Sequence, residues 1–342
     1  MTVPAPFLRR RSDSRGMMLA MLACLGVTAA HFAWRYDPQF MLRFAGYLAI
    51  GAAIDILYGV LRDGRPGCPR ASTLVTVALL VLSVPARMPW WQVGSGIFVA
   101  VFFGKRIVDP KALRVNPMLL GRLFMMIVFA NSIQVWLAPD AQIDAISSAT
   151  PLGLHVAEGV TWPPLKLWLG EIRGDWEGVY AVLPGSPGEV MPLLALLCGL
   201  VLYLAGVSDW RAGVMFVLGF AAACLVLDMP LVHHMSAGSI FFTAVYIVSD
   251  PRSMPASKSG RLLAGLLAGV LNAAIRRHGY LPEGVVPAVL AVNLLSPTLD
   301  RLAFTARGWW LQRRGSKPAT RGSGQKRGGN FFGAGDRWKW VG

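Results

Sequence analysis

The chain has 342 residues, of which 54% are apolar and 15% are charged, and its mean hydropathy is +0.50. Soluble domains carry about 25% charged residues, so this composition excludes an ordinary cytosolic enzyme and an intrinsically disordered protein. The net charge of +15 would suit a nucleic-acid partner, but nucleic-acid-binding proteins are less hydrophobic than this chain. The positions of the basic residues along the chain therefore matter more than their sum.

Ten apolar segments follow one another along the chain, and a helix that spans a bilayer needs about 20 such residues. Several segments are short, and Pro85 and Pro192 interrupt or border two of them, which is tolerated at membrane depth where protein or water covers the freed backbone. The sequence predicts an all-α integral membrane protein with about ten transmembrane helices, compatible with two five-helix halves. The predicted spans cover residues 17–34, 40–61, 71–88, 92–108, 116–138, 188–206, 212–229, 236–249, 261–275 and 285–302.

Lysine and arginine residues collect in every second connection between these spans, which predicts that those connections are cytoplasmic. The outer connections keep six basic residues, Arg35, Arg87, Lys166, Arg173, Arg276 and Arg277. We therefore expect a multi-pass membrane protein with both termini in the cytoplasm. A cleaved signal peptide at the first span is the alternative, but its removal would leave nine spans and reverse the sides of the basic loops.

The predicted organisation is a cytoplasmic segment (1–16), a transmembrane domain (17–302) and a basic, disordered cytoplasmic tail (303–342). The tail either binds anionic lipid or acts as a solvated topology signal. Residues 139–189 form a long periplasmic loop that is too polar to span the membrane and is acidic in an otherwise basic protein. Loops of this length are usually functional or disordered. Its apolar residues predict packing against the membrane surface, and they are Trp162, Leu165, Leu167, Trp168 and Leu169.

Ionisable residues within the predicted spans are candidate functional groups, because a charge at membrane depth is costly. Asp55 in the second span is the deepest carboxylate, Arg122 lies near the inner end of the fifth span, and Asp300 ends the tenth. A local partner explains Asp55 as well as ion transport does. The adjacent His233 and His234 point in different directions on a helix and make a poor metal site. The four cysteines form no C-x-x-C pair, so no disulfide framework or iron–sulfur cluster is predicted.

No phosphate-binding loop, dinucleotide fingerprint, zinc-protease motif or hydrolase nucleophile motif occurs, so hydrolytic catalysis has no support. The outer loop contains DAISSATPL from Asp144 to Leu152, a small, hydroxyl-rich stretch that by itself fits a turn or a helix cap. After the eighth span the chain reads SDPRSMPASKSGR from Ser249 to Arg261 and GYLPEGVVPAVL from Gly279 to Leu290. Asn116-Pro117 opens the fifth span.

Together these motifs resemble the RnfD/NqrB family, whose members are membrane subunits of the Rnf electron-transport complex and of the related sodium-pumping NADH:quinone oxidoreductase. The resemblance runs from about residue 16 to residue 301 with matching order and spacing. It implies that the outer loop carries FMN on a threonine through a phosphoester. The family's attachment motif has an aspartate, two variable residues, Ser or Thr, usually Gly, then Ala and Thr. Asp144, Ser147, Ala149 and Thr150 match it and Ser148 replaces the usual glycine, so the resemblance implies covalent FMN on Thr150.

The resemblance also implies an electron-transfer subunit rather than a stand-alone enzyme, working inside a complex that moves Na⁺ or H⁺. The implied partners are other membrane and redox subunits and a periplasmic flavin transferase that takes FMN from FAD, with no nucleic acid. A second flavin bound without a covalent link is left open, and sites for NADH or ferredoxin are expected on partner subunits. The alternative is a flavin-free channel or transporter, since about ten spans with broken helices fit that class as well.

Overall fold

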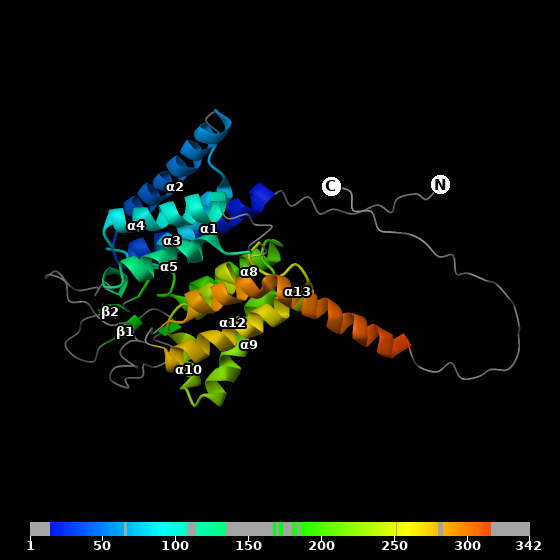
Figure 1. Ribbon diagram of the computed structural model, residues 1–342. Coiled ribbons are helices and arrows are strands. Elements are labelled where there is room, and N and C mark those ends of the chain that lie inside the picture. Colours follow the sequence, from blue (N-terminus) through cyan, green and yellow to red (C-terminus); the bar gives the residue numbers. More distant parts are fainter. Residues whose placement is uncertain are drawn as a thin grey trace, which may run out of the picture. The chain divides into compact units, whose positions relative to one another are not determined.

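The computed structural model describes residues 14–64, 67–107, 114–134, 167–168, 171–173, 180–182, 185–250, 252–279 and 283–315. The described chain is helical apart from one antiparallel pair of short strands, β1 (Glu171–Arg173) and β2 (Tyr180–Val182), in which Ile172 lies opposite Ala181 (Figure 1). Of the described residues, those up to Ala303 form one compact unit and those from Phe304 onward form a second.

The elements before the outer loop make up the first group of helices in Figure 1. They are α1 (Ser14–Arg35), α2 (Phe40–Asp63), α3 (Ala71–Leu82), α4 (Trp90–Phe98), the π-helix η1 (Val99–Ile107), α5 (Pro117–Val128) and the short 3₁₀-helix η2 (Ser132–Gln134). The elements after the loop are α8 (Pro192–Leu204), α9 (Trp210–Val226), α10 (Leu231–Ser236), α11 (Ile240–Phe242), the π-helix η3 (Thr243–Ile247), α12 (Lys258–His278) and α13 (Val285–Gly315). The two groups meet where α1 contacts α8.

Each predicted span contains helix, and the all-helical prediction is confirmed except for the β1–β2 hairpin, which the sequence did not predict. Three helices in the described part of the chain are long and apolar enough to cross a membrane: Ser14–Arg35, Phe40–Arg62 and Val285–Thr305. Four further apolar helices are shorter, namely α3, α5, α8 and α9. Short helices of this kind are expected where spans are broken at membrane depth, because surrounding protein can cover the freed backbone.

Several helix ends differ from their predicted positions, including those of α3, α5 and α13. Helix α3 ends at Leu82 rather than at residue 88, because Pro85 has no N–H to continue the helical ladder. Its last turn tightens, and both the N–H and the hydroxyl of Ser83 donate to the carbonyl of Leu80. Helix α13 continues to Gly315 instead of ending at residue 302, so the predicted tail begins as a helix, while residues 316–342 lie outside the described residues.

Burial separates the centre of the fold from its lipid-facing side. In α3, nine of the 12 residues are buried, as expected for a helix that is apolar all round. By contrast, α2 exposes Leu42, Leu57 and Leu61. A face of exposed leucines on a long apolar helix is what a lipid-facing helix presents.

Glycines allow α9 and α12 to pack with their backbones almost in contact. A side-chain carbon at Gly265 would overlap the carbonyl oxygen of Ala212, and one at Gly269 would overlap that of Phe216. Small residues at helix interfaces are the common way for membrane helices to gain van der Waals contact, because lipid supplies little hydrophobic drive between them.

Candidate functional site

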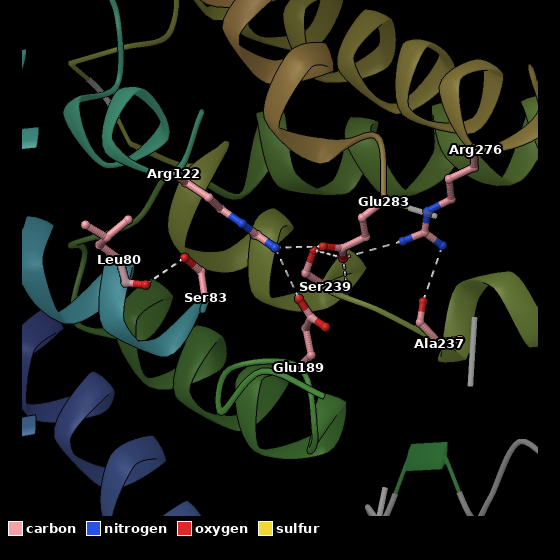
Figure 2. Close-up of polar contacts among 8 residues, drawn as sticks. All are labelled: Leu80, Ser83, Arg122, Glu189, Ala237, Ser239, Arg276 and Glu283. Atoms are coloured by element: carbon pink, nitrogen blue, oxygen red, sulfur yellow. Dashed lines mark hydrogen bonds and ion pairs between the residues drawn. The ribbon is translucent and has the colours of Figure 1, made fainter. Parts of the chain in front are cut away.

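A buried network of charged side chains connects residues that lie far apart in the sequence (Figure 2). Arg122 projects from the middle of α5, and its Nη2 lies 2.9 Å from Oε2 of Glu283 and 3.7 Å from Oε1 of Glu189. Glu189 lies just before α8 and Glu283 lies just before α13. One arginine from the first group of helices therefore joins two acidic residues that precede helices of the second group.

Glu283 has further partners on its other carboxylate oxygen, Oε1. The backbone N–H of Ser239 donates to it over 2.7 Å, and the Ser239 hydroxyl also donates to it. Nη2 of Arg276 lies 3.9 Å from the same oxygen. Nη1 of Arg276 donates to the carbonyl of Ala237 over 3.3 Å, and its guanidinium lies 5.0 Å from the ring centre of Phe220. Arg276 is thus held by contacts to charged, polar and aromatic groups.

Two glycines shape the backbone around this network. The N–H of Gly188 donates to the carbonyl of Leu82 at the end of α3, and a side chain at Gly188 would overlap the ring of Phe242. This contact brings the segment that contains Glu189 against the broken end of α3. Gly238 has φ +79°, a left-handed conformation that favours glycine, and it turns the chain so that Ser239 faces Glu283.

The two carboxyl groups of the network, which both precede the spanning helices, differ in their proton affinity. Burial, together with the nearby negative charge of Glu283, raises the pKa of Glu189 to about 8. Burial also opposes the ionisation of Glu283, but Arg122, Arg276 and the hydrogen bonds from Ser239 outweigh it and lower its pKa. The network therefore favours a protonated Glu189 beside an ionised Glu283. Chemically, this arrangement can bind and release a single proton.

Asp55, the deepest carboxylate predicted from the sequence, lies in a separate cluster. Its Oδ2 accepts the backbone N–H of Arg70 over 2.8 Å, and its Oδ1 is paired with the guanidinium of Arg106. The Arg106 guanidinium in turn lies 4.8 Å from the ring centre of Tyr58. The local partner that the sequence left open is thus present, and Asp55 does not join the network around Arg122.

The surroundings of Arg106 and Arg276 are alike in the two groups of helices. Arg106 lies near the end of the fourth helical segment of the first group and covers an aromatic ring on α2. Arg276 lies near the end of α12 and covers an aromatic ring on α9.

A basic cavity of about 220 Å³ lies between α1, α3, η1 and the start of α5. Its lining includes the basic residues Arg70, Lys105, Arg106, Arg114 and Arg252, together with Asp250 and Asn116. Lys105 is fixed by donating to the carbonyl and to the hydroxyl of Ser72. The excess of positive charge in the lining suits an anionic ligand.

The proposed attachment motif lies outside the described residues. Its residues are Asp144, Ser147, Ser148, Ala149 and Thr150. Further along the outer loop, Leu167 is buried, and the indole N–H of Trp168 donates to the hydroxyl of Ser236 over 2.8 Å. The Trp168 ring also packs at 5.0 Å on Phe241. Trp168 thus contacts α10 and α11 of the helical domain, while Trp162, Leu165 and Leu169 lie outside the described residues.

The other singled-out residues have structural partners. The side chain of Asn116 accepts the N–H of Met118 and caps α5, with Pro117 in the first turn. Asp300 accepts the N–H groups of Ala256 and Ser257 before α12, each over 2.9 Å. His233 and His234 are both buried, with their rings at 83° to each other. The described residues contain no cluster of three or more His, Cys, Asp or Glu side chains that would hold a metal ion.

A protein-family model described as the NQR2, RnfD, RnfE family matches residues 1–307. The chain belongs to this family. It is 31% identical over 334 residues to a subunit of the ion-translocating oxidoreductase complex of Stutzerimonas stutzeri, covering 86% of this chain and 91% of the relative. It is 28% identical over 301 residues to a subunit of the Na⁺-translocating NADH-quinone reductase of Chromohalobacter salexigens. That match covers 82% of this chain and 68% of the relative. The resemblance stated from the sequence motifs is thus confirmed.

The sequence identified Arg122 as a candidate functional residue but did not identify the acidic residues that pair with it, Glu189 and Glu283. Arg122 and Glu283 are 161 residues apart, and Glu283 was noted only as part of the Gly279-to-Leu290 motif. The available signal was the arginine itself, because a cation in the middle of an apolar helix requires a buried acidic partner. The sequence also placed Arg122 near the inner end of its span, whereas α5 ends at Val128 and leaves Arg122 near its middle.

Proposed function

We propose that this chain is the membrane flavoprotein subunit of an Rnf-type electron-transport complex and relays electrons through FMN covalently bound to Thr150. The observation that carries the proposal is the family match over residues 1–307, which includes the loop with Asp144, Ser147, Ala149 and Thr150. Curated relatives are named as subunits of an ion-translocating oxidoreductase complex and of a Na⁺-translocating NADH-quinone reductase. Bound FMN would supply the redox chemistry, and the protein would set its position and potential.

The residues of this chain would hold and orient the flavin-bearing loop. The hydroxyl of Thr150 forms the phosphoester, and the small neighbours Ser147, Ser148 and Ala149 give a flavin transferase access to it. Beyond the attachment motif, Trp168 on Ser236 and Glu189 beside Arg122 tie the later part of the loop to the helices. These contacts support a fixed position for this part of the loop.

The proposed membrane arrangement has ten spans in two five-helix halves, with both termini in the cytoplasm of a bacterial inner membrane and residues 139–189 in the periplasm. An arginine–aromatic contact in each group of helices, by Arg106 and by Arg276, supports the two halves. The alternation of basic and non-basic connections supports the orientation.

The partners in this proposal are the other membrane and redox subunits of the complex and the periplasmic flavin transferase. NADH or ferredoxin would bind those partners, and electron flow would be coupled to the movement of Na⁺ or H⁺. The buried carboxyl group of Glu189, whose pKa is raised beside Arg122 and Glu283, supports H⁺ as a participant. A second, noncovalent flavin stays a prediction.

The test is flavin fluorescence of the denatured protein in a gel, from cells that contain the transferase. We expect a fluorescent band for the natural chain, no band for Thr150→Ala, and a retained band for Ser148→Gly, which restores the family's usual glycine. An intact mass would show a single attached FMN. A Thr150→Ala variant that keeps its covalent fluorescence would contradict the proposal. Solute uptake by vesicles containing the flavin-free protein would instead favour a channel or transporter.

A further inference from the structure

A second site, unrelated to the flavin, lies where the start of α2 faces the start of α4. A groove of about 560 Å³ is lined by Arg43, Gly46 and Ile50 on α2 and by Arg87, Pro89 and Trp90 at the entry to α4. Both arginines lie on the side of the membrane where the sequence pattern keeps basic residues scarce. Their presence there calls for a physical reason.

Two guanidinium groups line the charged end of the groove, and both contact the carboxylate of Asp37. Oδ2 of Asp37 lies 3.4 Å from Nη1 of Arg43 and 3.8 Å from Nε of Arg87. Arg43 also donates to the carbonyl of Ala86 over 3.3 Å, which fixes its position. The side chain of Asp37 is only 7% exposed, whereas that of Arg87 is 55% exposed. Two positive groups sharing one negative group leave an excess positive charge, which Arg87 presents at the surface.

The rest of the groove is apolar. Trp90 is 72% exposed at the start of α4, a position typical of the aromatic belts at membrane interfaces. Below it, Gly46 leaves open space, since a side-chain carbon there would meet no atom within 4 Å. Helix α2, which contains Gly46, also exposes Met41 and Leu42, as expected for a helix in contact with lipid.

We infer that this groove binds one anionic phospholipid, with its phosphodiester beside Arg87 and Arg43 and an acyl chain along Gly46 and Ile50. A lipid with one net negative charge balances the excess charge of the arginine pair. A zwitterionic lipid brings an ammonium group toward the same arginines and gains less. A basic residue near a membrane surface adds about 1 kcal/mol toward anionic lipid, which corresponds to about a fivefold preference.

Native mass spectrometry of the full chain in detergent, with equal amounts of phosphatidylglycerol and phosphatidylcholine, tests the inference. We expect the natural chain to retain one phosphatidylglycerol in preference to phosphatidylcholine. Arg87→Gln should reduce that preference about fivefold. Gly46→Leu should reduce retention of the lipid by filling the groove while leaving the melting temperature unchanged. Neither variant touches the attachment motif, so covalent flavin should be retained in both.

Arg211→Gln is the matched control. Arg211 is also partly exposed, is paired with an aspartate (Asp209) and covers a tryptophan (Trp210), but it lies at the start of α9, away from the groove. Its substitution should leave the lipid preference unchanged. The inference is overturned if Arg87→Gln and Gly46→Leu retain lipid as the natural chain does, or if Arg211→Gln loses the preference equally. Cross-linking from position 90 to another subunit in the assembled complex, in place of lipid, would also overturn it.

Discussion

Glu189 and Glu283 both lie beside Arg122, yet their carboxyl groups do not titrate alike. Glu283 lies 2.9 Å from the arginine and receives two hydrogen bonds from Ser239, whereas Glu189 lies 3.7 Å away. Two carboxylates near one guanidinium cannot both be stabilised fully, so the more weakly paired group keeps its proton. The difference between the two acids therefore follows from the number and distance of their partners.

This difference predicts how the stability of the folded protein depends on pH. Burial and the charge of Glu283 raise the pKa of Glu189 to about 8 in the folded protein, above its ordinary value of 4.5. Between these two pH values the folded state binds more protons than the unfolded state, so stability falls as the pH rises through this window. We expect Glu189→Gln to remove this slope, measured as the melting temperature in detergent from pH 4.5 to pH 8.

Glu283→Gln is the control for this prediction. It removes the charge that faces Arg122 and Arg276, and breaking a buried ion pair costs about 3–5 kcal/mol. We expect it to lower the melting temperature across the whole pH range and also to weaken the slope attributed to Glu189, because the negative charge of Glu283 contributes to the raised pKa of Glu189. An unchanged slope in Glu189→Gln would mean that another group binds the proton.

At the scale of the elements, close helix packing is the feature that the sequence shows least directly. Each predicted apolar segment contains helix, and α1 and α2 lie within a few residues of their predicted bounds. The glycines of α12 gave no sign of their partners, because which backbone approaches them depends on the tertiary arrangement. Pro85 was visible in the sequence, but whether it would break the span depended on buried protein around residues 83–88.

Gly269→Ala tests the contact between α9 and α12. The added methyl group would overlap the carbonyl oxygen of Phe216 and the amide nitrogen of Phe220, so the two helices must move apart. Overpacking of this kind costs about 1–3 kcal/mol. We expect a lower melting temperature in detergent.

Gly26→Ala on α1 is the matched control for Gly269→Ala, since a methyl group there meets no atom within 4 Å. Alanine is also the better helix former, so Gly26→Ala should be neutral or slightly stabilising. Equal melting temperatures for the natural chain and Gly269→Ala would show that the helices tolerate the separation.

At the scale of the whole molecule, the sequence predicted the membrane class and the family but not the ionic network. Membrane class follows from composition and period, which are local properties of the chain. The network depends on contacts between residues such as Arg122 and Glu283, which are distant in sequence, and on the loop segment that brings Glu189 to α3. The proposed flavin site rests on a short local motif, so it could be stated from the sequence without knowledge of any such contact.

The orientation of the whole chain can be tested with one natural cysteine. Cys68 is exposed in the connection between α2 and α3, whereas Cys198 and Cys224 are buried and Cys24 is partly buried within α1. Arg62 in the last turn of α2 and Arg70 just before α3 flank this connection, so its proposed location is the cytoplasm. A membrane-impermeant maleimide should label Cys68 in inverted membrane vesicles but not in intact cells, and Cys68→Ser should abolish the labelling. A cysteine introduced as Arg87→Cys into the Cys68→Ser variant should show the opposite pattern, because Arg87 lies across one predicted span from position 68. Labelling of Cys68 from outside intact cells would reverse the proposed topology and place the loop of residues 139–189 on the cytoplasmic side.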